Sequence, residues 1–257
     1  MRLEWRPGDP IELYVIRPLV KRNPPVGLFL LNYTFDTNIF QSDYWCTQAK
    51  QNGIAVVGFG SALSLQRFHS PRPMKTWFVS ELQEALATST HDVQMVLNYL
   101  DTRKDLDLLH VGMYGQGSGG AIAILAASAD PRITALDVTD PWGDWPDWLK
   151  GSRQIPDEER ADYLKPEFLQ KVQGLDPVTY LPELKVQSLR IQQVTSDSVT
   201  PPAAKAKIAS AAPKPDEVVH YPDNQAQHKA IFLGGVTEWL SLHLQPRSTM
   251  MVSNNPQ

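Results

Sequence analysis

Residues 111–121 read VGMYGQGSGGA, and this stretch decides the fold. An apolar segment, 108–114, precedes four glycines in six residues, and an alanine-rich segment begins at Ser118. Continuous apolar runs are typical of strands buried on both faces, and glycine permits tight turns and close helix packing. The stretch therefore predicts a strand, a very sharp turn and a helix.

The first interpretation of this turn is a nucleophile elbow, G-x-S-x-G, in which an apex serine exposes its hydroxyl to substrate. With the flanking glycines placed on Gly115 and Gly119, the apex residue is Gly117, which has no side chain. Ser118 is a poor substitute, because one residue along a helix turns the side chain by about 100° from the apex direction. The nucleophile position is therefore vacant.

The second interpretation is a dinucleotide-binding loop. Gly115, Gly117 and Gly120 also spell G-x-G-x-x-G, and Asp137 and Asp140 follow at about the distance of a ribose-binding acid. A nucleotide-binding unit usually opens its domain, whereas at least two strand–helix units precede these glycines. Too few strands follow for the rest of a six-stranded dinucleotide sheet, so the context favours the elbow.

Composition narrows the function classes. A chain of 257 residues with 42% apolar content suits one α/β domain with an insertion. The net charge of −4 and the lack of a basic run argue against nucleic acid as a partner. Cys46 is the only cysteine, which excludes a disulfide and a cysteine-based metal site. We expect no metal, no cofactor and a small-molecule ligand.

The termini and hydropathy bear on location. The first ten residues, MRLEWRPGDP, contain no apolar signal region, and no stretch approaches the roughly 18 apolar residues of a membrane span. We therefore expect a cytoplasmic chain without a membrane partner.

The coarse pattern alternates strands and helices. Strands are expected at 11–17, 26–31, 54–59, 108–114, 133–138, 188–194 and 217–221, and helices at 39–51, 79–100, 118–129, 203–211 and 230–244. Cys46 falls in the first of these helices, where a small core residue is its ordinary role. This order predicts a mostly parallel sheet with right-handed crossovers and helices on both faces.

The alternation stops between residues 141 and 184, where Trp142, Trp145 and Trp148 occur within seven positions. We interpret 1–140 and 185–244 as two parts of one core, 141–184 as a cap insertion, and 245–257 as a disordered tail. The three indoles either pack the insertion against the sheet or wall an apolar ligand pocket.

Two further motifs follow the elbow. Residues 194–201, VTSDSVTP, resemble a G-x-x-D-x-x-V-P turn with Asp197 as its acid, and residues 223–228, DNQAQH, place His228 after the last strand. With the elbow, they make residues 11–244 resemble the α/β-hydrolase superfamily, in particular its dienelactone-hydrolase and prolyl-peptidase-like members. Alone, Asp197 would be an Asx-turn residue and His228 a surface histidine.

The resemblance implies an α/β-hydrolase fold with a small cap insertion. It also implies a triad of Asp197, His228 and the vacant position Gly117. The oxyanion donors would be the N–H of Ser118 and one near Tyr33 or Thr34. The superfamily's usual His-Gly before the second donor reads Asn32-Tyr33 here.

Three functions fit these residues. The first is a non-catalytic homologue that binds a small molecule beneath the insertion, with Trp142 and Trp145 among its binding residues. The second is an enzyme that uses Asp197 and His228 as a general-base dyad, and the third is a dinucleotide-binding oxidoreductase. Under the first, Gly117→Ser should create weak esterase activity, since acid, base and at least one oxyanion donor would remain.

Overall fold

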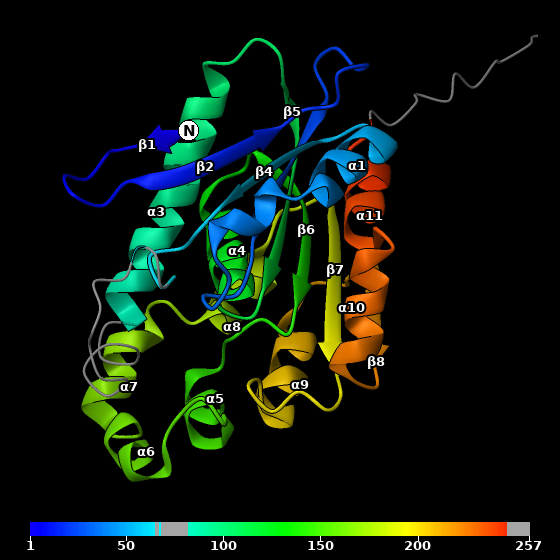
Figure 1. The fold of residues 1–257 in the computed structure, drawn as a ribbon. Helices are drawn as coiled ribbons and strands as arrows, with labels where there is room; N and C mark the ends of the chain where they lie inside the picture. The colour runs from blue at the N-terminus through cyan, green and yellow to red at the C-terminus, as the bar shows by residue number, and fades with distance from the viewer. Residues whose placement is uncertain (65–66, 68–81, 246–257) are drawn as a thin grey trace, which may run out of the picture.

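The computed structural model describes residues 1–64, 67 and 82–245. Within them the chain forms an eight-stranded sheet in the order β1-β2-β4-β3-β5-β6-β7-β8 (Figure 1). The strands are β1 Arg2–Leu3, β2 Ile11–Ile16, β3 Pro25–Leu30, β4 Ala55–Phe59, β5 Asp107–Gln116, β6 Ile133–Thr139, β7 Ser188–Val194 and β8 Glu217–Tyr221. The pairs β1–β2 and β2–β4 are antiparallel and the pairs from β4 through β8 are parallel, so the expected mostly parallel sheet is confirmed.

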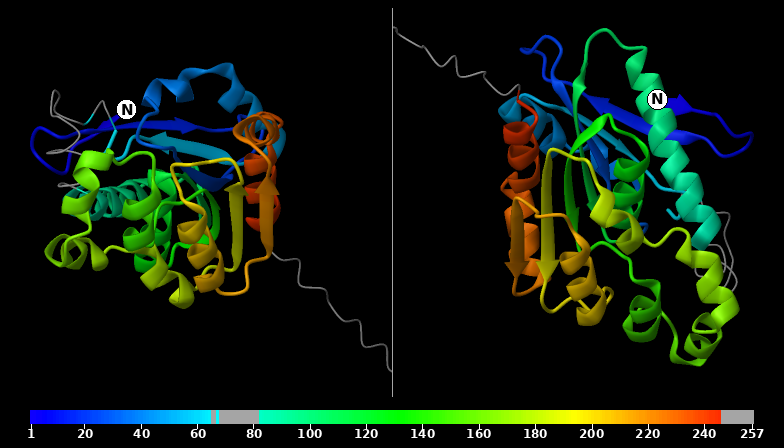
Figure 2. Two further views of the ribbon diagram at one scale, coloured as in Figure 1. Left: turned by 90° about the horizontal axis from the view of Figure 1, so that it is seen from below. Right: turned by 180° about the vertical axis from the view of Figure 1, so that it is seen from behind.

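Helices cover both faces of the sheet, as Figure 2 shows. Helices α3 (Leu82–Asp101), α4 (Ser118–Ala129) and α9 (Pro202–Ala211) share one apolar core. Helices α1 (Asp43–Asn52) and α11 (Gly235–His243) share a second core on the other face, with α10 (Asn224–Phe232) beside them. None of the described helices has the length and apolar character of a membrane-spanning segment.

Helix α4 packs very closely on the sheet. Residues 118–127 are all buried, and a Cβ at Gly119 would collide with the backbone carbonyl of Leu30 on β3. A Cβ at Gly115 would likewise meet the backbone of Gly119. Small residues at these positions therefore set the distance between β5, β3 and the start of α4.

The segment between β6 and β7 folds into short helices beyond the carboxyl ends of the parallel strands (Figure 1). They are α5 Trp145–Gly151, α6 Asp157–Tyr163, α7 Pro166–Gln173, α8 Pro177–Tyr180 and the 3₁₀ helix η2 Leu181–Glu183. Trp142, Trp145 and Trp148 are all buried here, at 1% exposure or less. The indoles pack the segment onto the sheet, which is the first of the two roles expected for them.

Three sequence expectations need correction. The single helix expected at 230–244 is two helices, because Gly234 adopts a left-handed φ of 88° and its neighbour Gln48 leaves no room for a Cβ. The helix expected at 39–51 is a 3₁₀ turn, η1 Thr37–Gln41, followed by α1. Cys46 on α1 is exposed rather than part of the core. The expected tail at 245–257 lies almost wholly outside the described residues.

The close packing of α4 can be tested by adding one methyl group. Gly119→Ala should lower the free energy of unfolding by about 1–3 kcal/mol, because the backbone of Leu30 or of α4 must move to make room for the methyl group. Gly174→Ala is the matched control, since Gly174 has a helical φ of −66° and no atom within 4 Å of an added Cβ. Its effect in urea unfolding should stay within about 0.5 kcal/mol. Equal stability of the two variants would contradict the packing described here.

Candidate functional site at the carboxyl end of strand β5

The turn between β5 and α4 has the sharp geometry that its glycines predict. Gly117 has φ 56° and ψ −116°, a combination that L-residues adopt only under strain. Its N–H donates to the carbonyl of Thr139 at 2.9 Å, and its carbonyl accepts the N–H groups of Gly120 and Trp142 at 3.0 and 3.1 Å. Glycine holds this conformation without a Cβ clash. The backbone angles would strain any other residue, but they do not strain Gly117.

Ser118 does not replace the missing apex side chain. The residue is fully buried, and its Oγ accepts a hydrogen bond from the N–H of Tyr33 at 2.9 Å. The same hydroxyl donates to Oδ1 of Asn32 at 3.0 Å. Ser118 therefore ties α4 to the loop after β3 instead of facing a substrate.

Asn32 is the central residue of this site, and in the sequence it is distinguished only by standing where the superfamily usually has His-Gly. Its Oδ1 accepts from the N–H of Tyr33 at 3.0 Å and from the N–H of Ser118 at 3.4 Å, in addition to the Ser118 hydroxyl. These two N–H groups are the donors expected to face a substrate oxyanion. A Cβ at Gly117 would lie 3.0 Å from the same oxygen, so Asn32 Oδ1 stands beside the vacant apex.

Thr34, the other expected donor residue, is exposed, and its hydroxyl accepts from Asn32 Nδ2 at 3.4 Å. Trp142 also reaches the apex, since its Nε1 lies 3.4 Å from the position of a Cβ at Gly117. Its ring packs against those of Tyr33 and Trp148 with centroids 5.7 and 4.8 Å apart. Trp145 packs further back, edge-on to Trp148, and its Nε1 donates to Leu175 at 3.2 Å.

Asp197 lies at the carboxyl end of β7, but its carboxylate is used locally. It accepts from the N–H groups of Val199 and Thr200 at 3.2 and 2.9 Å, as an Asx-turn residue does. His228 lies on α10 and is exposed. The described residues show no hydrogen bond between Asp197 and His228, although both follow the last two strands as the resemblance implies.

Lys205 on α9 is a buried residue that no sequence motif indicated. Its Nζ lies 3.3 Å from Oδ1 of Asp140 and 3.8 Å from Oδ2 of Asp197. It also donates to the carbonyls of Val194 and Asp197. A cation thus occupies the space between the two acids that end β6 and β7.

Burial raises the pKa of Asp140 to about 6, even though Lys205 and the N–H of Val194 counteract the loss of hydration. The nearby Asp197 carboxylate adds to the rise. Asp140 therefore binds a proton more readily in the folded than in the unfolded chain.

Asp137, the other candidate ribose-binding acid, cannot reach a ligand. It is fully buried, and its carboxylate accepts from Arg190 at 2.7 and 3.1 Å and from Gln192 at 2.8 Å. Desolvation raises the pKa of this carboxyl. Asp137 is therefore held inside the core by Arg190 and Gln192 and is not placed to bind a ribose.

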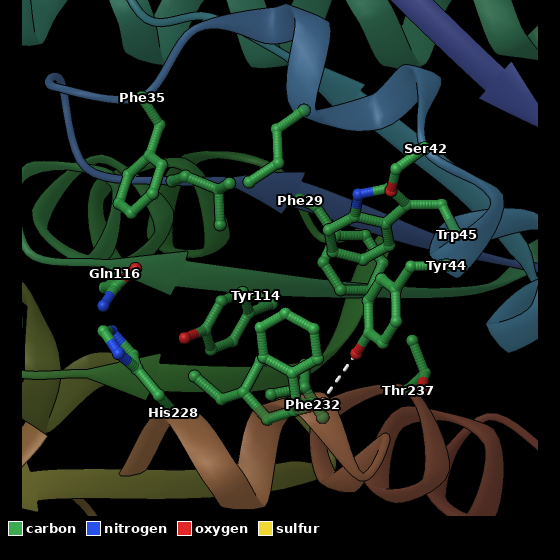
Figure 3. Close-up of a pocket in the computed structure, with 14 residues that line it drawn as sticks. Phe29, Phe35, Ser42, Tyr44, Trp45, Tyr114, Gln116, His228, Phe232 and Thr237 are labelled. Carbon is green, nitrogen blue, oxygen red and sulfur yellow. Dashed lines mark hydrogen bonds between the residues drawn. The ribbon is translucent and has the colours of Figure 1, made fainter. Parts of the chain in front are cut away.

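A cavity of about 420 Å³ adjoins the turn on the α1 and α11 face of the sheet (Figure 3). None of the described residues that line it belongs to the 141–184 segment, beneath which a pocket was expected. His228 and Gln116 face each other at one end, and Ser42 and Trp45 lie at the other. Its lining consists of Phe29, Leu31, Phe35, Ile39, Ser42, Tyr44, Trp45, Tyr114, Gln116, His228, Ile231, Phe232, Val236 and Thr237.

No protein-family model matches the chain, and no curated protein matches it by sequence. Solved structures do resemble it. Acetyl xylan esterase 1 of a Thermoanaerobacterium species matches 88% of this chain and 79% of its own, with a TM-score of 0.67 and 15% identity. Est1E of Butyrivibrio proteoclasticus matches 95% of this chain and 98% of its own, with a TM-score of 0.68 and 13% identity.

An acylaminoacyl peptidase of Pyrococcus horikoshii matches 95% of this chain but 39% of its own, with a TM-score of 0.68 and 15% identity. At such low identity these likenesses show the fold alone. Among the described residues, no three His, Cys, Asp or Glu side chains are grouped to hold a metal ion.

The raised pKa of Asp140 leads to a prediction about pH. The raised pKa means that protonation of Asp140 favours the folded chain. This contribution to the free energy of unfolding is complete at pH values below 3.8 and is lost as the pH rises through about 6. Asp140→Asn stays neutral, so the parent should lose about 3 kcal/mol of unfolding free energy relative to this variant between pH 3.5 and 7. Urea unfolding at several pH values measures the difference. Parallel stability curves would show that folding does not shift the pKa of Asp140.

Proposed function

We propose that this chain, which has the α/β-hydrolase fold, is a non-catalytic binding protein for a small molecule. The observation that carries the proposal is Asn32 Oδ1, which takes the N–H groups of both Tyr33 and Ser118. An acyl-transfer site needs such donors free for the charge that develops on the substrate. Here the chain supplies its own oxygen to them.

The remaining parts of the site support the same proposal. The acyl-enzyme route needs a hydroxyl at the apex, a base beside it and an acid that orients the base. Gly117 has no hydroxyl, and the carboxylate of Asp197 binds backbone N–H groups and lies near Lys205. Because the apex has no hydroxyl and Asp197 makes no hydrogen bond to His228 among the described residues, we expect the chain to bind without turning over esters.

The cavity supports binding as the remaining activity. Its volume is within the range of small-molecule sites, and most of its lining is apolar or aromatic, as is usual for such sites. It opens at the surface beside Phe35 and Phe232, which are 38% and 74% exposed. An apolar molecule entering here would cover surface that water now contacts.

The absence of covalent chemistry can be tested by rebuilding the site. The parent chain should neither hydrolyse p-nitrophenyl esters nor react with a fluorophosphonate probe. Gly117→Ser should react weakly, and Gly117→Ser with Asn32→Gly at least tenfold faster, because one freed oxyanion donor is typically worth about 10²–10³ in rate. Gly117→Ser should also lower the free energy of unfolding by about 1–3 kcal/mol through backbone strain.

Asn32→Gly alone is the control for this experiment, since it removes the Oδ1 acceptor from the Ser118 N–H without adding a nucleophile. Mass spectrometry of the labelled peptide locates the reacting residue. Labelling of the parent at Ser118 would overturn the proposal that the site is non-catalytic.

Binding in the cavity can be tested separately with the neutral apolar fluorophore N-phenyl-1-naphthylamine. The parent should enhance its fluorescence, and Ile39→Trp should weaken binding at least tenfold by filling the cavity. Leu109→Trp is the matched control, because Leu109 is 83% exposed on β5 and is not among the residues that line the cavity. Equal effects of the two tryptophans, or no binding by the parent, would refute a ligand site here.

A further inference from the structure

The polar side chains that line the cavity are unevenly distributed along it. Three of its polar side chains are already satisfied within the protein. Tyr44 Oη donates to the carbonyl of Ile231 at 2.7 Å, Thr237 Oγ1 donates to Gln48 at 2.6 Å, and Tyr114 Oη donates to Thr139 at 3.2 Å. The hydroxyl protons of these wall groups are therefore used within the protein and are not available to an anionic ligand.

Gln116 and His228 differ from these wall groups. Figure 3 shows their side chains facing each other at one end of the cavity, from β5 and α10. Within the described part of the chain, neither side chain makes a hydrogen bond. Gln116 offers an amide donor, and His228 offers a ring N–H and can carry a positive charge.

The other end of the cavity is polar but neutral. Ser42 presents a hydroxyl there, and the indole Nε1 of Trp45 is buried without a hydrogen-bond partner in the described residues. Neither group can carry a positive charge. No acidic side chain is among the described residues that line the cavity. An anionic group would therefore be placed at the Gln116 and His228 end.

The body of the cavity favours a flat ring system over a flexible chain. Six aromatic side chains line it: Phe29, Phe35, Tyr44, Trp45, Tyr114 and Phe232. Phe29 and Trp45 already pack edge-on, with centroids 5.0 Å apart. Edge-to-face and offset contacts with a ligand ring contribute beyond simple burial of apolar surface.

From these placements we infer that the cavity binds an aryl carboxylate, with its rings between Tyr114, Phe232 and Trp45 and its carboxylate against Gln116 and His228. Because His228 is exposed, the carboxylate keeps part of its hydration and avoids the cost of full burial. Charge-assisted hydrogen bonds from the amide and the imidazolium hold it. This inference rests on the proposed function, since it names the ligand class of the same cavity.

The test compares two ligands of the same shape. Naphthalene-2-carboxylate and naphthalene-2-carboxamide are titrated at pH 6 by displacement of N-phenyl-1-naphthylamine from the parent chain. The carboxylate should bind at least tenfold more tightly. His228→Ala and Gln116→Leu should each reduce the affinity for the carboxylate at least fivefold. His228→Ala should change the affinity for the carboxamide by less than twofold. His220→Ala, at an exposed histidine of β8 that does not line the cavity, should change neither affinity.

The outcomes separate this inference from the function on which it rests. If both naphthalenes bind equally well and His228→Ala affects neither, the cavity binds apolar molecules but the carboxylate assignment is wrong. If decanoate, a carboxylate without rings, binds as tightly as naphthalene-2-carboxylate, the aryl assignment is wrong. If the parent binds neither the fluorophore nor either naphthalene, the proposed function fails as well.

Discussion

The turn at Gly117 is the constraint on which the rest of the site depends. One residue with φ 56° and ψ −116° joins the end of β5 to the end of β6 through its N–H, and to α4 and Trp142 through its carbonyl. Because the turn is so tight, α4 begins almost in contact with β3. That approach is possible only where Gly119 lacks a Cβ.

A vacant apex changes what the surrounding polar groups must do. The N–H groups of Tyr33 and Ser118 are shielded from water, and buried donors without partners destabilise a fold. Asn32 Oδ1 satisfies both of them, together with the Ser118 hydroxyl. The ammonium group of Lys205 similarly balances the negative charges of Asp140 and Asp197, which follow β6 and β7. In each case an intramolecular partner holds a group that a catalytic site would keep available, which supports the proposed loss of chemistry.

The cavity lies on one face of strand β5, which ends at this turn. Side chains alternate between the two faces of a strand, so Tyr114 and Gln116 face α1 and α11 while Gly115 faces α4. On the face with α4, the indoles of the segment after β6 are buried in the apolar core. The cavity lies on the opposite face, where residues of α10 and α11 contribute to its lining. One strand thus ends at the Gly117 turn and lines the apolar cavity with one of its faces, and the proposed ligand would lie against Gln116, one residue before the apex.

The sequence by itself determined the seven expected strands and their order along the chain, because these depend on neighbouring residues. The expected bounds of β7, β8 and α4 agree with the structure, since apolar runs and small residues are local signals. Local glycine chemistry likewise predicted the sharp turn and its empty apex.

Tertiary structure alone decided how the site is used. Asn32 and Ser118 are 86 positions apart, Asp140 meets Lys205 across two different elements, and neither contact has a pattern in the sequence. The face that carries the cavity, and the burial of the three indoles, follow from how helices distant in sequence share the sheet. Hydrogen bonds and packing between remote segments depend on the folded path of the whole chain, and no local window of sequence contains that path.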